Sequence, residues 1–209
     1  MNQKYIDEEL CSKCKGKCCK RSGCTFLPED FEKLTYDYLM NEIKTKPISI
    51  TAIIYMKKVG NQNMYYPILV PRIKNNNRES IDLISYKSGC SILTDKGCPL
   101  EKKPSMALSL KPEKDGNCIQ TISQIQIAKK WMKHQVVLEK IVKELTGMSL
   151  EARTRYEFQL LDEFLSNLSS AQKYIDQEAY ELLDMQKLVN ERVYSKKAVE
   201  CLKIRHRKK

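Results

Sequence analysis

The sequence predicts an α+β protein in which a small cysteine-rich metal-binding module, built on a β-hairpin or three-stranded sheet, precedes a C-terminal bundle of about three helices. Eight of the nine cysteines lie within residues 1–120, and β-branched residues cluster between the two cysteine groups. From residue 119 onward, apolar residues recur at the helical period. We therefore expect a cysteine-cluster module over 1–120 and a helical region with a basic tail over 121–209.

Composition sets limits on the class of protein. Of the 209 residues, 42% are hydrophobic, which is enough apolar material for a core. No apolar run approaches the roughly 20 residues that a membrane-spanning helix needs, and the first ten residues hold three acids instead of a secretory signal. No glycine falls in a GxGxxG or GxxxxGK[ST] pattern. We expect a cytoplasmic protein without a membrane segment or a common nucleotide-binding loop.

The net charge of +11 comes from two local blocks. Residues 11–21 contribute five basic residues and no acid, and residues 196–209 contribute seven basic residues against Glu200. In the first block the lysines alternate with cysteines, where ammonium groups would stabilise thiolates bound to a metal. The second block is interpreted first as a solvated helix end and only second as a phosphate-binding tail.

The cysteines point to metal ligation, because thiols in an intracellular protein are kept reduced. Cys11 and Cys14 form a CxxC pair, and the turn at Gly16 brings in Cys18 as a third ligand. Cys19 is adjacent, so it either completes the first site or faces a second one. The predicted ligands are Cys11, Cys14, Cys18, Cys19, Cys24, Cys90, Cys98 and Cys118.

The ligand type leaves the metal open. All-sulfur ligation fits tetrahedral zinc and an iron-sulfur cluster equally well. Eight cysteines make two four-thiolate sites if all of them bind, or one site with spare thiols if they do not. Cys201, in the basic C-terminal helix, is interpreted as a small buried hydrophobe instead of a ligand.

The stretches CSKCKGKCCKRSGCTFLPEDFEKL and GCSILTDKGCPLEKKPSMALSLKP, followed by Cys118, resemble the YkgJ-like cysteine-cluster family. The resemblance covers roughly residues 11–118. It implies a zinc- or iron-chelating domain in a family that includes the flagellin lysine methylases. It also implies that Cys11, Cys14, Cys18 and Cys19 form the first ligand group, with Cys90 and Cys98 as the later pair and Cys118 as the closing cysteine.

One position departs from the family pattern. After the proline motif at Pro104, where the family has a cysteine, this chain has Ala107. Either this member uses one ligand fewer, with Cys24 or Cys118 substituting, or the cysteine has been replaced in this sequence.

In the first half, residues 27–46 carry apolar residues at helical spacing after Pro28 and predict a short helix. Residues 48–56 and 64–70 are rich in strand-forming residues and flank the turn sequence at 60–63, which predicts a hairpin. Residues 78–86 are expected to add a third strand, so that the sheet brings the two cysteine groups together.

In the second half, one amphipathic helix is expected from about residue 119 until Gly147. Ser149 should cap a second helix, and a third should begin at about Ser170. The apolar faces are expected to pack on the cysteine module or on a protein partner. His134 is interpreted first as a helix-surface or interface histidine, and a metal ligand or proton carrier is the alternative.

The acids Glu29 and Asp30 are interpreted as helix-start charges, with contact to a metal or a substrate lysine as the alternative. The leading functional hypothesis is a metal-binding protein with one or two cysteine-ligated centres. The family resemblance supplies an alternative, an S-adenosylmethionine-dependent lysine N-methyltransferase, although the chain lacks a glycine-rich methyl-donor loop. A nucleic-acid-binding zinc protein comes third, because neither basic block has interleaved aromatics.

Overall fold

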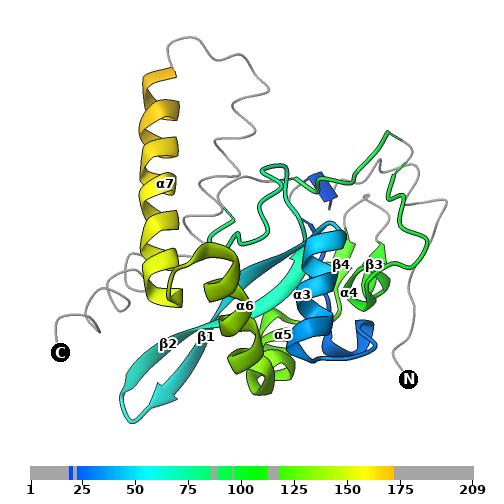
Figure 1. The fold of residues 1–209 in the computed structure, drawn as a ribbon, viewed down its shortest axis with the longest axis horizontal. Helices are drawn as coiled ribbons and strands as arrows, with labels where there is room; N and C mark the ends of the chain where they lie inside the picture. The colour runs from blue at the N-terminus through cyan, green and yellow to red at the C-terminus, as the bar shows by residue number, and fades with distance from the viewer. Residues whose placement is uncertain (1–18, 21–22, 86–88, 96, 113–117, 172–209) are drawn as a thin grey trace. The chain divides into compact units, whose positions relative to one another are not determined.

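The computed structural model describes residues 19–20, 23–85, 89–95, 97–112 and 118–171. These residues form a mixed α and β structure, which confirms the predicted α+β class (Figure 1). The elements, in chain order, are η1 (Pro28–Asp30), α3 (Tyr36–Thr45), β1 (Ile48–Val59), β2 (Gln62–Ile73), α4 (Ser105–Leu108), β3 (Leu110–Pro112), β4 (Cys118–Gln120), α5 (Gln124–Trp131), η2 (Met132–His134), α6 (Gln135–Thr146) and α7 (Leu150–Ala171).

The chain divides into two compact units. The first contains Met1–Ile53 and Ile68–Thr154, and the second contains Ile54–Pro67 and Arg155–Lys209. The base of the hairpin and all described cysteines belong to the first unit. The division predicted at residue 120 stays a prediction.

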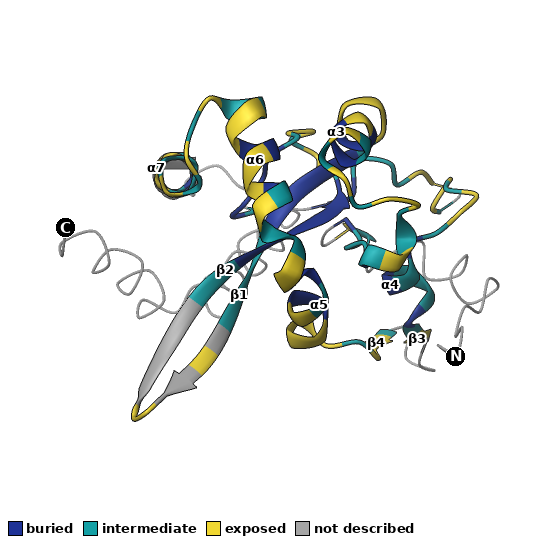
Figure 2. Ribbon diagram, turned by 60° about the horizontal axis from the view of Figure 1, so that its bottom comes forward, coloured by how far each residue is buried: buried dark blue, intermediate teal, exposed yellow. Residues whose placement is uncertain are grey.

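The predicted hairpin is confirmed, and it is longer than the sequence indicated. Strands β1 and β2 form a two-stranded sheet whose turn is made by Gly60, at a positive φ of 58° that glycine adopts without strain. Figure 2 shows that both strands are buried at the base of the hairpin and become more exposed beyond it. The base of the hairpin therefore supplies the sheet part of the core.

The core of the first unit lies between this base and the helices. Helices α3 and α6 pack against each other. Gln135, at the start of α6, clamps the edge of β2, because its side chain accepts a hydrogen bond from the Leu69 amide at 2.8 Å and donates one to the Leu69 carbonyl at 3.0 Å. The apolar residues that are at most 1% exposed are Leu27, Leu39, Ile43, Ile50, Leu69, Val70, Ile127, Ala128, Trp131, Leu138, Ile141 and Val142.

The predicted third strand over 78–86 is wrong. The segment does lie along β1, since the Ile50 amide donates to the Ser80 carbonyl at 2.9 Å and the Asp82 amide donates to the Ile50 carbonyl at 2.9 Å. Within the described residues 78–85, one parallel bridge forms, between Ile50 and Ile81, and Ser85 takes a positive φ of 55°. Ile81, Asp82, Leu83 and Ile84 are all buried.

The helix predicted over 27–46 is split into η1 and α3. Phe31 has an extended backbone, with φ −105° and ψ 141°, and its ring packs 5.4 Å from Phe26 and 5.9 Å from Trp131. Aromatic packing thus ends η1 after one turn. Thr35 is also extended and precedes α3.

The single helix predicted from residue 119 is also wrong at its start. Residues Cys118–Gln120 form β4, which pairs antiparallel with β3. Ser123 starts α5 through a capping box, because its hydroxyl accepts from the Gln126 amide at 3.2 Å while the Gln126 side chain accepts from the Ser123 amide at 2.7 Å. The helix then breaks at η2, and α6 ends at Gly147 as predicted, with φ 67°.

Helix α7 confirms Ser149 as a cap, since the Ala152 amide donates to the Ser149 hydroxyl at 3.2 Å. Ser170 lies inside α7, so the third helix does not begin there. The remainder of that predicted helix, the basic tail and Cys201 lie outside the described residues. Among the helices that are described, none has the length and apolarity required to span a membrane.

Candidate metal centre

The structure describes five of the eight predicted ligands, which are Cys19, Cys24, Cys90, Cys98 and Cys118. The other three lie outside the described residues, and they are Cys11, Cys14 and Cys18. The geometry below therefore concerns the end of the first cysteine group and the whole of the later ones.

The segment that follows the first cysteine group pairs with the C-terminal end of β2. Thr25 and Arg72 form an antiparallel bridge, and the Ile73 amide donates to the Cys24 carbonyl at 2.8 Å. Gly23 lies so close to β2 that an added Cβ would be 2.0 Å from the Ile73 carbonyl oxygen. Only a residue without a side chain fits this approach.

The second cysteine segment pairs with the residues just beyond β2. Asn75 and Cys90 form an antiparallel bridge, and the Asn76 amide donates to the Gly89 carbonyl at 3.0 Å. Gly89 has a φ of 92°, which favours glycine. One continuous piece of chain, from Arg72 to Asn76, thus pairs with both cysteine-bearing segments.

The two cysteine groups also contact each other directly. The Cys90 amide donates a hydrogen bond to the Cys19 carbonyl at 2.7 Å. The backbones of Cys19 and Cys90 are therefore neighbours, although 70 residues separate them in sequence. Cys19, the last residue of the CxxCxGxCC motif, and Cys90 thus meet without a third strand, whereas Cys11, Cys14 and Cys18 lie outside the described residues.

Cys98 follows a tight turn in which the amides and carbonyls of Thr94 and Gly97 bond to each other, at 3.1 and 2.9 Å. Its side chain is exposed, whereas Cys90 is buried. Burial raises the pKa of the Cys90 thiol most strongly, and the Cys98 thiolate raises it further, while the Arg72 guanidinium acts to lower it. The two thiols are thus near enough for the charge of one to act on the other.

Thiolate sulfur suits both zinc and iron-sulfur clusters, so the donor chemistry of Cys19, Cys90 and Cys98 fits either group. A metal cation would neutralise the thiolate charges that otherwise repel each other. Within the described residues alone, no three side chains of histidine, cysteine, aspartate or glutamate gather closely enough to hold an ion. Ligation by these cysteines stays a prediction.

Cys118 and Ala107 belong to β4 and α4, respectively. Cys118 begins β4, opposite Pro112 of β3, and Ala107 lies in α4, beside β3 and β4 in Figures 1 and 2. Cys24 lies beside the end of β2, and its thiol donates to the Thr25 carbonyl at 3.7 Å. Of the two cysteines expected to substitute at the position of Ala107, Cys24 pairs with the Arg72–Asn76 segment, because its carbonyl accepts from the Ile73 amide.

Sequence reasoning missed a polar cluster, here called the Asn75 cluster, made of the buried residues Arg72, Asn75 and Asp82 and the half-buried Ser85. Asn75 belongs to the run Asn75–Asn77, a composition that favours a turn. Asn75 and Asp82 are each 1% exposed. The one signal was the placement of Arg72 and Asp82 in otherwise apolar segments, where a charge needs a partner.

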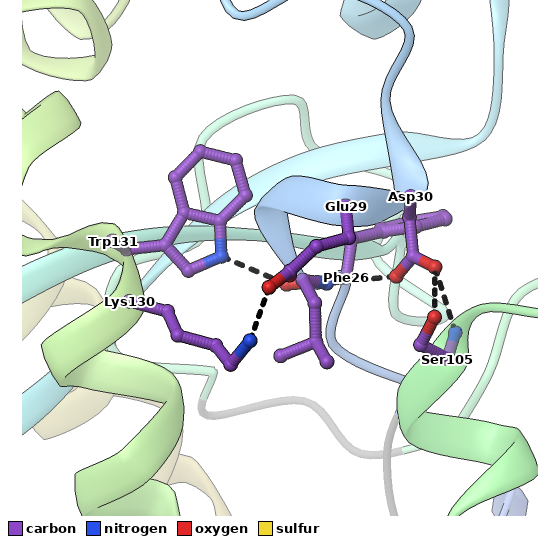
Figure 3. Close-up of polar contacts among 7 residues, drawn as sticks. Phe26, Glu29, Asp30, Ser105, Lys130 and Trp131 are labelled. Atoms are coloured by element: carbon purple, nitrogen blue, oxygen red, sulfur yellow. Dashed lines mark hydrogen bonds and ion pairs between the residues drawn. The ribbon is translucent and has the colours of Figure 1, made fainter. Parts of the chain in front are cut away.

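The acids that follow Pro28 make specific contacts, which Figure 3 shows. Asp30 accepts hydrogen bonds from the Leu27 amide at 2.8 Å and from the Ser105 amide and hydroxyl at 2.9 and 2.5 Å. It therefore ties η1 to the start of α4, next to the proline motif. Asp30 thus stabilises the start of η1, as predicted, and the same carboxylate also binds the first residue of α4.

Glu29 forms an ion pair with Lys130 of α5 (Figure 3). Burial acts to raise the pKa of Glu29, but the hydrogen bond and charge of Lys130, with the charge of Lys133, outweigh it and lower the pKa. Glu29 is thus an ionised partner of a lysine in this chain.

His134 is half-buried and lies edge-on to Trp131 at 5.8 Å between ring centroids. Burial lowers the pKa of His134, and the charge of Lys133 lowers it further. The ring is thus held neutral against an aromatic surface, which agrees with a structural role for this histidine.

Comparisons with known proteins found no matching family model, no matching curated protein and no matching solved structure.

Proposed function

We propose that this chain is a metal-binding protein with one or two cysteine-ligated centres, which hold an iron-sulfur cluster or zinc. The observation that supports this most directly is the 2.7 Å hydrogen bond from the Cys90 amide to the Cys19 carbonyl. It connects the second cysteine segment to the end of the CxxCxGxCC motif, and a shared centre requires that proximity.

The protein supplies more than sulfur. Burial raises the pKa of the Cys90 thiol, and the guanidinium of Arg72, a residue only 6% exposed, acts against that rise. A buried guanidinium favours the thiolate that a metal needs, as do the lysines predicted to surround the first cysteine group. When bound, the metal would tie together segments that otherwise meet only through backbone hydrogen bonds.

The experiment is metal quantification and visible absorption of protein purified without oxygen. Broad brown absorption with iron and sulfide would assign an iron-sulfur cluster, because thiolate-to-iron charge transfer is coloured. Colourless protein with stoichiometric zinc would assign zinc. Protein that retains neither metal, and that takes up neither on reconstitution, would refute the proposal.

A matched pair of variants tests the ligand set. Cys98→Ser should lower the bound metal, because a hydroxyl is a poor ligand for zinc or iron in a thiolate site. Cys201→Ser, the same substitution at the cysteine expected not to bind, should leave the metal content unchanged. Equal metal content in the two variants would remove Cys98 from the site.

A further inference from the structure

The side chain of Asn75 makes three hydrogen bonds in the protein interior. Its Oδ1 accepts from the Gly23 amide at 3.2 Å and from the Arg72 guanidinium. Its Nδ2 donates to Asp82 Oδ2 at 2.8 Å. With an exposed fraction of 1%, Asn75 has no access to water that could replace these partners.

The partners of Asn75 are themselves anchored to the hairpin. Arg72 donates to the Ser85 hydroxyl at 2.6 Å, and that hydroxyl lies 3.0 Å from the Thr51 hydroxyl of β1. The Asp82 amide donates to the Ile50 carbonyl at 2.9 Å. The side chain of Asn75 is therefore held from both sides by groups attached to β1 and β2.

Asn75 contacts both cysteine-bearing segments at once. Its backbone forms the antiparallel bridge with Cys90, and its side chain holds the Gly23 amide. Gly23 lies four residues after Cys19, whose carbonyl accepts from the Cys90 amide. A change in the side chain of Asn75 would thus alter the spacing of the two segments.

We propose that Asn75 is a positioning residue for the cysteine centre, which sets the distance between the Cys19 and Cys90 segments without ligating metal. The proposal rests on the proposed function. Groups that hold metal ligands in place typically affect metal affinity about 10- to 100-fold, although they never touch the ion. Asn75 meets this description through Gly23 on one side and Cys90 on the other.

The test is a titration of the metal-free full chain with Co²⁺, whose visible d–d absorption reports the geometry of a thiolate site. Asn75→Ala should bind at least about 10-fold more weakly than wild type or show shifted absorption bands. Asn76→Ala is the matched control, because Asn76 is exposed and its backbone still pairs with Gly89. Folded Asn75→Ala with wild-type affinity and spectrum would overturn the proposal.

A second variant separates positioning from general stability. In Asn75→Asp, the side chain can still accept from Gly23 and Arg72 but cannot donate to Asp82. Affinity for Co²⁺ should lie between those of wild type and Asn75→Ala. If Asn75→Asp is as weak as Asn75→Ala while both unfold at the wild-type denaturant concentration, the hydrogen bond to Gly23 has no positioning role and the proposal fails.

Amide hydrogen exchange on metal-free wild-type protein decides the matter if neither variant folds. The Gly23 and Cys90 amides should both be protected, because each has a partner inside the protein. Exchange at the rate of an exposed loop would overturn the proposal. If wild-type protein binds no Co²⁺, Zn²⁺ or iron, the proposed function fails instead, whatever the exchange rates.

Discussion

The Asn75 cluster and the aromatic cluster of Phe26, Phe31, Trp131 and His134 hold the same unit together by opposite means. In the aromatic cluster, rings meet at centroid distances of 5.4–5.9 Å, and one polar contact, from Trp131 Nε1 to the Phe26 carbonyl at 2.9 Å, satisfies the indole. In the Asn75 cluster, nearly every contact is a hydrogen bond between buried polar groups.

The two clusters should respond differently to amino-acid substitution. Apolar packing is non-directional, so its loss costs free energy roughly in proportion to the area and volume removed. Buried hydrogen bonds are directional, and a lost partner leaves a desolvated group unpaired. The aromatic cluster should therefore dominate the stability of the first unit, whereas the Asn75 cluster should control the geometry beside the cysteines.

The largest expected effect is that of Trp131→Ala. Trp131 is fully buried, and its removal leaves a large cavity between α5 and the segment around Phe31. We expect the free energy of unfolding to fall by about 3–5 kcal/mol, measured by chemical denaturation. Met132→Ala, at an exposed neighbour, should change it by no more than about 0.5 kcal/mol. Equal losses in the two variants would contradict the assigned core.

Gly23→Ala tests the close approach beside Cys24. The new Cβ would lie 2.0 Å from the Ile73 carbonyl oxygen, so the backbone must move. We expect a loss of about 1–3 kcal/mol in the free energy of unfolding, together with weaker metal binding. Gly147→Ala is the control, because its Cβ meets nothing within 4 Å and its φ of 67° costs about 1–2 kcal/mol. Metal binding that falls equally in both variants would argue against a local effect at Gly23.

The pH dependence of stability tests the role of Asp82 in the Asn75 cluster. Burial raises the pKa of Asp82 above its ordinary value of 3.8, although Arg72 acts in the opposite direction. The folded state therefore holds the proton more tightly, and the stability from this group is lost as pH rises from about 3.8 through the folded pKa. Relative to Asp82→Asn, wild-type protein should lose stability over that interval in urea denaturation. A relative gain would mean that the charge of Arg72 outweighs burial.

The smallest expected effect is that of Glu29→Gln, which removes the ion pair with Lys130 on the surface. Exposed ion pairs contribute at most about 1 kcal/mol, and salt screens them. The thermal unfolding midpoint should fall slightly at low salt and match wild type at high salt. A large, salt-independent fall would show that Glu29 has a further role in placing η1.

The predictions from the sequence succeeded where the signal was local. Gly147 ended a helix and Ser149 started one, because a positive φ and a capping hydroxyl act within a few residues. The hairpin was predicted from its strand-forming residues and the turn at Gly60. Ser123 could have been recognised as well, since its capping box with Gln126 is a short-range pattern.

The predictions failed where partners distant in sequence compete with local preference. Residues 78–86 have strand composition, but the hydrogen bonds of Asp82 to Asn75 and of Ser85 to Arg72 replace a regular ladder. The helix predicted from residue 27 stops at Phe31, whose ring packs against Trp131. For the candidate site, the sequence identified the cysteines, but it held no sign that Asn75 contacts both segments that carry them.

By itself, the sequence determined the α+β class, the hairpin and the residues able to ligate a metal, because periodicity, turn residues and thiol chemistry are properties of short stretches. Only the tertiary structure decided that Cys19 and Cys90 become neighbours and that Asn75 lies between their segments. Those contacts join residues far apart along the chain, and their free energy exists only after the intervening hairpin has folded.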